Sequence, residues 1–195
     1  MFLQNYFYYF EKALSDDFCD QIVQLGKEHV QQKALTEDID LQKSRDSSVA
    51  WLQDQWLYDK IEPYIQEANV QAGWNFEWQG SEACQFTVYR EQQHYGWHQD
   101  SLKQPYHRPG SYDHGLIRKL SVTVSLEDGN KYEGGDLQFD LRNRVDSESV
   151  ILSAHQSRKK GSIIVFPSFV WHRVTPVTKG TRYSLVIWSI GNPFK

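Results

Sequence analysis

The amino-terminal part of the chain carries apolar residues at helical spacing. Ser15, followed by two aspartates, is typical of an N-cap with acidic residues in the first helical turn. Phe18, Ile22 and Leu25 then recur at the spacing that places them on one face of a helix. This pattern predicts a helix over about 16–31.

A second apolar stripe follows a polar interval. Residues 32–50 carry mixed charges and few apolar positions, which predicts a loop and a short strand ending at Trp51. Over 53–69 one helical face is apolar, through Trp56, Leu57, Ile61, Ile65 and Ala68. Pro63 lies inside this second predicted helix and should bend or break it, because proline lacks the backbone N–H that an internal helix residue donates.

After Gly73 the pattern changes to short runs of β-branched and aromatic residues separated by glycines, which is typical of strands in a β-sandwich or barrel. We expect strands at 74–79, 83–90, 120–126, 135–141, 163–166, 172–174 and 182–190. The 195 residues therefore predict one mainly β domain, with mostly helical support in 1–72 and a β-barrel core in 73–195. The long polar segments 101–117 and 142–160 predict functional or mobile loops, and the first is a candidate lid.

Alternation along three of the predicted strands assigns a set of residues to one face, because successive side chains of a strand point to opposite sides, and on the first two strands this face is polar. These faces comprise Ser121, Thr123 and Ser125; Gln85, Thr87 and Tyr89; and Arg182, Ser184, Val186 and Trp188. Such a face suits either solvent or the lining of a polar cavity, and solvent is the commoner explanation for a single strand. Two such polar faces beside candidate metal ligands favour the cavity.

Candidate metal ligands begin with the segment HYGWHQD, which holds His98 and Asp100. Two residues apart on a strand, an imidazole and a carboxylate face the same side and can bind one metal ion. His172, in the segment PSFVWHRV, is the best candidate for completing a facial triad of two histidines and one carboxylate. Such a triad leaves coordination positions open, as non-haem iron requires in order to bind a co-substrate and dioxygen.

Arg182 opens a predicted strand ten residues after His172. A buried guanidinium needs an anionic partner, and its planar fork binds a carboxylate through two hydrogen bonds. An H-x-D pattern alone is weak, because short patterns arise by chance and a single histidine is more often a surface or core residue. The combination of H-x-D, a later histidine and this arginine is far more specific. The histidines of polar loops are read as solvated: His94, His107, His114 and His155.

Charge and composition narrow the functional class. The net charge of −4 offers no broad positive surface, which counts against a nucleic-acid substrate. Cys19 and Cys84 form no C-x-x-C pair, so we expect two buried, reduced thiols. The aromatic segment MFLQNYFYYF lacks the features of a signal peptide, and no apolar run reaches the ~18 residues of a membrane span. We therefore expect a cytoplasmic protein with no membrane partner.

The segments around these residues resemble a known family. They are RDSSVAWL (45–52), TVYREQQHYGWHQD (87–100), RKLSVTVSLED (118–128), YEGGDLQF (132–139), KGSIIVFPSFVWHRV (160–174) and KGTRYSLVIW (179–188). The sequence resembles the 2-oxoglutarate- and Fe(II)-dependent oxygenase superfamily, and within it the prolyl 4-hydroxylase-like group. The resemblance implies a double-stranded β-helix, which is a jelly-roll barrel of two facing sheets.

The resemblance also implies which residues hold the metal and the co-substrate. His98, Asp100 and His172 match the iron ligands of the family. Arg182 matches the arginine that pairs with the distal carboxylate of 2-oxoglutarate, and Tyr89 matches a tyrosine that lines the same pocket.

Further positions follow from the same resemblance. Ser125 stands where some relatives carry a tyrosine that reaches the distal carboxylate, and it is the candidate replacement for that contact. Trp188 matches a tryptophan beside the iron site of prolyl hydroxylases. Arg45 and Trp51 match a motif that flanks the peptide substrate.

The function implied is hydroxylation of a prolyl residue in a peptide or protein. Fe(II), 2-oxoglutarate and O2 would be required, ascorbate is a candidate reductant, and 2-oxoglutarate would be decarboxylated to succinate and CO2. One alternative keeps this chemistry and gives it a free amino acid or another small molecule. Another is a non-catalytic barrel that binds a metal or a sugar; Arg182 argues against it, because such a barrel needs no carboxylate-pairing arginine. The oligomeric state is not predicted.

Overall fold

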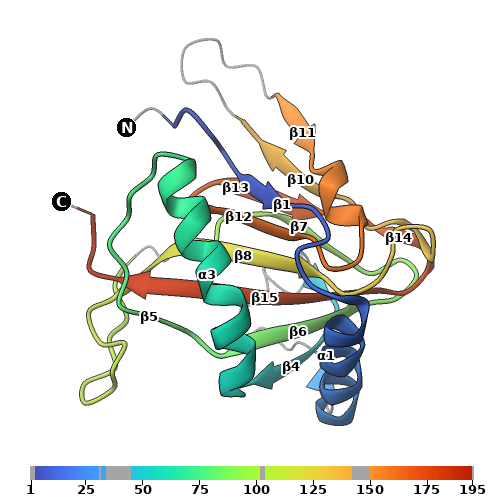
Figure 1. Ribbon diagram of the computed structural model, residues 1–195, viewed down its shortest axis with the longest axis horizontal. Helices are drawn as coiled ribbons and strands as arrows, with labels where there is room; N and C mark the ends of the chain where they lie inside the picture. The colour runs from blue at the N-terminus through green and yellow to red at the C-terminus, as the bar shows by residue number, and fades with distance from the viewer. Residues whose placement is uncertain (1–2, 31, 34–44, 102–103, 142–149, 195) are drawn as a thin grey trace.

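The computed structural model describes residues 3–30, 32–33, 45–101, 104–141 and 150–194 (Figure 1). Its helical elements are α1 (Asp16–His29), α3 (Gln55–Gln71) and the short 3-10 helix η1 (His155–Arg158). Its strands are β1 (Tyr8–Phe10), β2 (Gln32–Lys33), β3 (Arg45–Asp46), β4 (Ser48–Leu52), β5 (Gly80–Ser81), β6 (Cys84–Tyr89), β7 (His94–His98), β8 (Ile117–Ser125), β9 (Tyr132–Gly134), β10 (Leu137–Asp140), β11 (Ile151–Ser153), β12 (Ile163–Pro167), β13 (Trp171–Val174), β14 (Val177–Gly180) and β15 (Arg182–Gly191). Within these ranges no helix has the length and apolar character needed to cross a membrane.

The strands form two main sheets with antiparallel pairing. Among the described residues, the larger sheet has the order β1-β12-β8-β15-β6-β4-β2, with β5 also paired to β15, and the smaller has the order β11-β10-β13-β7-β3. From β6 onward the chain alternates between them, so that β6, β8, β12 and β15 lie in the larger sheet and β7, β10 and β13 in the smaller. This alternation is the jelly-roll arrangement, and it confirms the predicted double-stranded β-helix.

Both long helices cover the outer face of the larger sheet (Figure 1). The Ser15 side chain accepts a hydrogen bond from the backbone N–H of Phe18 and caps α1 as expected. The apolar faces of the central strands pack beneath the helices, and α1 approaches so closely that a Cβ on Gly26 would lie 2.3 Å from the ring of Phe86. The helices therefore support the sheet from outside and leave its inner face to the cavity between the sheets.

Between the sheets the space is divided into an apolar part and a polar part. At one end Leu137, Phe139, Phe166 and Val174 belong to a buried apolar cluster. The polar faces of β6, β8 and β15 contribute to a cavity beside that cluster. Because side chains alternate along these strands, their polar residues face the space between the sheets and line a cavity there, as the sequence pattern predicts.

The amino-terminal segment also extends both sheets. Strand β1 pairs with β12 and β4 pairs with β6 in the larger sheet, whereas β3 pairs with β7 in the smaller one. The first 72 residues therefore contribute strands as well as the two helices.

Three sequence-based expectations differ from the structure. The strand expected at 74–79 is absent, because the Asn69 side chain binds both the N–H and the C=O of Phe76 and holds the segment away from ladder pairing. Of the bend or break expected at Pro63, the break does not occur, because α3 continues through this residue and its buried face offsets the lost hydrogen bond. The described part of 142–160 contains β11 and η1, whereas 142–149 lie outside the described residues.

Candidate functional site

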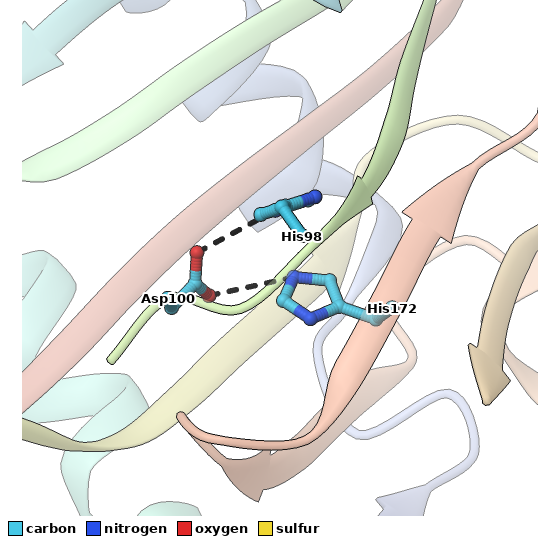
Figure 2. Close-up of side chains that lie close together, drawn as sticks. All are labelled: His98, Asp100 and His172. Atoms are coloured by element: carbon cyan, nitrogen blue, oxygen red, sulfur yellow. Dashed lines mark ion pairs between the residues drawn. The ribbon is translucent and has the colours of Figure 1, made fainter. Parts of the chain in front are cut away.

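Three side chains meet at the inner face of the smaller sheet (Figure 2). His98 ends β7 and is the register partner of His172 on the adjacent strand β13. The carboxylate of Asp100 lies between them, with Oδ1 3.6 Å from Nε2 of His98 and Oδ2 3.5 Å from Nε2 of His172. One ligand atom of each residue lies within 4.8 Å of the others, so the three can hold one metal ion.

Asp100 reaches this position from outside the strand. The expectation that His98 and Asp100 share one strand is wrong, because β7 ends at His98. The backbone N–H groups of Asp100 and Ser101 both donate to the carbonyl of Ser168 at 2.9 Å, which turns the chain toward β13. Ser168 is fixed in turn by a 2.9 Å contact between its hydroxyl and that of Ser121 on β8. The loop before His172 therefore also positions the carboxylate.

Each imidazole presents its Nε2 atom to the centre of the group. Nδ1 of His98 lies 2.8 Å from the carbonyl of Gly96, and Nδ1 of His172 lies 2.9 Å from the carbonyl of Val170. A carbonyl only accepts, so each Nδ1 must carry the proton and donate it. The lone pair then lies on Nε2, where it can coordinate a cation.

Burial sets the charge of the group. Burial, together with the neighbouring His98, lowers the pKa of His172 to about 4, so its imidazole is neutral at pH 7. Burial opposes ionisation of Asp100, but the positive charge of the protonated form of His172 and the Arg118 cation hold its pKa below its usual range. A buried carboxylate between imidazole lone pairs is a donor set that suits a divalent transition metal, including Fe(II).

Arg182 is the first residue of β15 and lines another wall of the cavity. It is 2% exposed and faces its register partner Tyr89 on β6, with its guanidinium 5.4 Å from the centre of the tyrosine ring. Its Nη1 atom donates to the hydroxyl of Ser184 at 3.2 Å, and its Nη2 atom has no hydrogen-bond partner among the described residues. A buried cation with a free nitrogen at a cavity wall fits a carboxylate ligand such as the distal group of 2-oxoglutarate.

A glycine makes room for this arginine. Gly135 adopts φ +64°, and a Cβ at this position would lie 3.0 Å from Cδ of Arg182. The two glycines of the β9–β10 turn, Gly134 and Gly135, both have positive φ, as their sequence context predicts.

The cavity collects most of the predicted residues. The lining comprises Gln85, Tyr89, Tyr95, His98, Asp100, Thr123, Leu137, Phe166, His172, Val174, Arg182, Ser184, Val186 and Trp188. Ser125 is not among these residues. Its hydroxyl donates to the backbone carbonyl of Ser157 in η1, so it turns away from the position expected for a co-substrate contact.

Arg45 and Trp51 lie beside the cavity. Nη1 of Arg45 donates to Gln85 at 3.5 Å, its guanidinium lies 4.8 Å from the centre of the Tyr95 ring, and Nη2 is buried without a partner among the described residues. Trp51 is 53% exposed, and its ring centre lies 6.2 Å from that of Trp188. Trp188 is 5% exposed, with a buried indole N–H that has no partner in the described ranges.

Sequence reasoning missed Tyr95, whose ring stacks on His98 with centroids 3.5 Å apart and planes 14° apart. Residues three apart on a regular strand face opposite sides. Here a register shift pairs His98 with His172 but Tyr95 with Val174, so β7 carries one extra residue and Tyr95 reaches the cavity. A bulge of this kind leaves no clear signal in the sequence.

Curated proteins with similar sequences include a PKHD-type hydroxylase of Xylella fastidiosa strain 9a5c, which is 34% identical over 108 residues. The match covers 53% of this chain and 42% of that relative. A PKHD-type hydroxylase of Shewanella oneidensis is 34% identical over 104 residues, covering 53% of this chain and 40% of the relative. The chain thus spans less than half the length of these relatives.

Solved structures with a similar fold include the viral collagen prolyl hydroxylase of Paramecium Bursaria Chlorella virus-1 in its 2-oxoglutarate complex. It has a TM-score of 0.66 at 20% identity, over 96% of this chain and 97% of that one. A Trichoplax adhaerens prolyl hydroxylase in complex with a hypoxia-inducible factor peptide fragment has a TM-score of 0.70 at 17% identity, over 95% and 84% of the two chains. These likenesses confirm the double-stranded β-helix.

A sequence match to a protein-family model shows the family to which the chain belongs. The model described as the 2OG-Fe(II) oxygenase superfamily matches residues 84–190, which is more than half of the chain and includes all the residues of the proposed metal group. The chain therefore belongs to the 2OG-Fe(II) oxygenase superfamily.

Proposed function

We propose that this oxygenase hydroxylates a prolyl residue in a peptide or protein. The observation that carries the proposal is the convergence of two features on one cavity. A His98–Asp100–His172 group lies on one wall, and the buried guanidinium of Arg182, with a free nitrogen, lies on another. A metal-binding group beside a carboxylate-binding group is what a 2-oxoglutarate-dependent reaction requires of the protein.

The two groups would bind different ligands, one the metal ion and the other the co-substrate. His98 and His172 would hold Fe(II) through Nε2 and Asp100 through its carboxylate, while Arg182 would pair with the 5-carboxylate of 2-oxoglutarate. When bound, Fe(II), 2-oxoglutarate and O2 together supply the oxidative decarboxylation that yields succinate and CO2 and transfers one oxygen atom to the substrate. The protein contributes orientation, since each ligand and the arginine are fixed by strands or by backbone hydrogen bonds.

Apolar side chains exclude water from part of the cavity. Leu137, Phe166, Val174 and Val186 line it between the polar groups. In such surroundings an ion pair between Arg182 and a carboxylate is stronger than in water, because the local dielectric is low.

The substrate side of the cavity supports a peptide. Trp51 offers an exposed ring near Trp188, and Arg45 offers a buried, unpartnered nitrogen to an acceptor such as a backbone carbonyl. An aromatic pair suits the compact, apolar pyrrolidine ring of proline, and a guanidinium suits the polar backbone beside it. The prolyl hydroxylases with a similar fold are consistent with this substrate class.

Succinate formation tests the proposal. The wild-type chain, supplied with Fe(II), ascorbate and 2-oxoglutarate, should form succinate, and a library of prolyl peptides should raise the rate and gain about 16 mass units per oxygen inserted. His172→Ala should abolish both signals, whereas His155→Ala, which alters an exposed histidine, should not. Succinate formation stimulated only by free amino acids would favour a small-molecule substrate and refute the peptide assignment.

A further inference from the structure

Outside the proposed metal site, Glu82 forms a dense set of contacts. Its carboxylate accepts two 2.7 Å hydrogen bonds from Arg118, one from Nε and one from Nη2. Its Oε1 atom also accepts a 2.8 Å hydrogen bond from the hydroxyl of Tyr106. The side chains of Arg118 and Glu82 are only 18% and 13% exposed, so this is a shielded pair with two-point geometry.

The pair lies directly against a wall of the cavity. The guanidinium of Arg118 stacks over the Trp188 ring, 3.9 Å from its centre. The backbone N–H of Glu82 donates to the carbonyl of Trp188 at 2.9 Å. The indole N–H of Trp188 has no hydrogen-bond partner among the described residues, so packing and the stack with Arg118 restrain the ring rather than a hydrogen bond.

The same carboxylate holds the segment 104–116, which precedes β8. Within it the backbone groups of Tyr106 bond to Leu116 and Gly115, and this closes the segment into a compact loop. Burial, together with the charge of Glu82, raises the pKa of Tyr106 to about 12, although Arg118 opposes the shift, so the phenol keeps its proton and donates. The loop is thus tied to the cavity wall through one oxygen of Glu82.

We propose that Glu82 is a positioning residue that anchors both the loop 104–116 and the Arg118 guanidinium, and through Arg118 fixes the indole of Trp188 at the cavity wall. The consequence for catalysis rests on the proposed function: Trp188 would present a defined face to the prolyl ring only while Glu82 holds Arg118. An unpaired Arg118 would be a buried cation free to turn toward Asp100 or solvent, and the stack would be lost.

The test measures the environment of Trp188 and the protection of the loop amides, and neither measurement depends on enzymatic activity. Protein labelled with 5-fluorotryptophan gives one fluorine NMR line per tryptophan, and loss of a line in Trp188→Phe assigns the one of interest. Hydrogen–deuterium exchange reports on the segment 104–116. In Glu82→Gln the Trp188 line should shift or broaden, and amides of the loop should exchange about tenfold faster, because hydrogen bonds to a charged acceptor are lost.

Two further variants separate positioning from a general loss of stability. The double variant Glu82→Gln/Arg118→Met removes the pair without leaving a buried charge, so it should fold and still show both changes. Glu133→Gln removes the exposed pair of Glu133 with Lys179, whose side chains are 67% and 74% exposed, and should leave both signals unchanged. A double variant with the wild-type Trp188 line or wild-type loop exchange would overturn the inference.

Kinetics then connect the positioning to substrate. In Glu82→Gln the KM for the prolyl peptide should rise about tenfold, in proportion to the stacking lost, whereas the KM for 2-oxoglutarate should stay within about twofold. Absence of succinate formation by the wild-type chain would refute the proposed function, yet the fluorine and exchange measurements would still decide the role of Glu82. An equal rise in both KM values would refute selective positioning of Trp188.

Discussion

The guanidinium of Arg182 lies 5.4 Å from the centre of the Tyr89 ring, directly opposite it in the register of β15 and β6. The ring covers one side of the arginine, and the hydroxyl of Ser184 satisfies Nη1, while Nη2 stays without a partner among the described residues. The contacts hold the cation in place and leave part of its hydrogen-bonding capacity for a ligand. This arrangement supports the proposed role of Arg182 in binding the carboxylate of a co-substrate.

Replacing Arg182 should affect co-substrate binding much more than folding. In Arg182→Met the KM for 2-oxoglutarate should rise by about a hundredfold, because one partner of a buried charge pair is removed. Stability without ligand should be unchanged or higher, since a buried and incompletely bonded cation is lost. Initial rates at varied 2-oxoglutarate and urea denaturation check the two parts. Arg173→Met, which removes an arginine bonded to Gln138, is the matched control and should leave the KM unchanged.

Gly135 provides a second, indirect test of the same pocket. In Gly135→Ala the new Cβ would lie 3.0 Å from Cδ of Arg182 and 3.0 Å from Cγ2 of Val177, so the arginine must shift and the KM for 2-oxoglutarate should rise about tenfold. Gly73→Ala introduces a comparable backbone strain at φ +74° in open space, and it should cost stability without changing this KM. Equal KM values for the two variants would show that Gly135 does not control the position of Arg182.

Metal binding can be measured without turnover. Titration of the apo-protein with Mn(II) should give one site and raise the thermal midpoint, because a ligand that binds only the folded state stabilises it. Asp100→Asn and His172→Ala should weaken binding by more than the roughly 10–100-fold lost when an outer-shell partner is removed. His155→Ala alters an exposed histidine and should bind as the wild type does. Undiminished affinity in His172→Ala would exclude this residue as a ligand.

Alternation along the central strands predicts the cavity wall well. Arg182, Ser184, Val186 and Trp188 all line the cavity, because β15 is regular over this stretch and each second residue faces inward. The convergence of His98, Asp100 and His172 is also predictable, since the three carry ligand atoms in a combination that few structural roles require. Local side-chain chemistry on regular strands is therefore readable from sequence.

The remaining features depend on irregular geometry that the pattern does not encode. Tyr95 faces the cavity because β7 contains a bulge, and Asp100 reaches the group because Ser168 turns the chain after the strand ends. Ser125 follows the alternation of β8 but lies at its end, where its hydroxyl donates a hydrogen bond to the backbone of η1 and does not face the cavity. In each case the three-dimensional structure departs from the simple alternation of side chains along a strand.

The two free thiols predict how stability depends on pH. Burial raises the pKa of Cys19 from an ordinary value of 9.0 to about 11 and that of Cys84 to about 12. Above pH 9 the unfolded chain therefore loses thiol protons that the folded chain keeps, so each thiol's contribution is fully present below pH 9 and falls as pH rises toward the folded pKa. Each should lower the free energy of unfolding by at most about 1.4 kcal/mol per pH unit in that window, which is the limit for a difference of one proton.

Urea denaturation between pH 8 and 10.5 measures this slope. Cys19→Ala should be less stable than the wild type at pH 8, because a buried side chain is shortened, but its stability should fall less steeply above pH 9. The comparison between the two proteins cancels the contributions of lysines and tyrosines that titrate in both. A thiol reagent at pH 8 should react with Cys19 and Cys84 only after unfolding, because both are fully buried and protonated. Parallel pH profiles for wild type and variant, or rapid labelling of the folded protein, would contradict the raised pKa values.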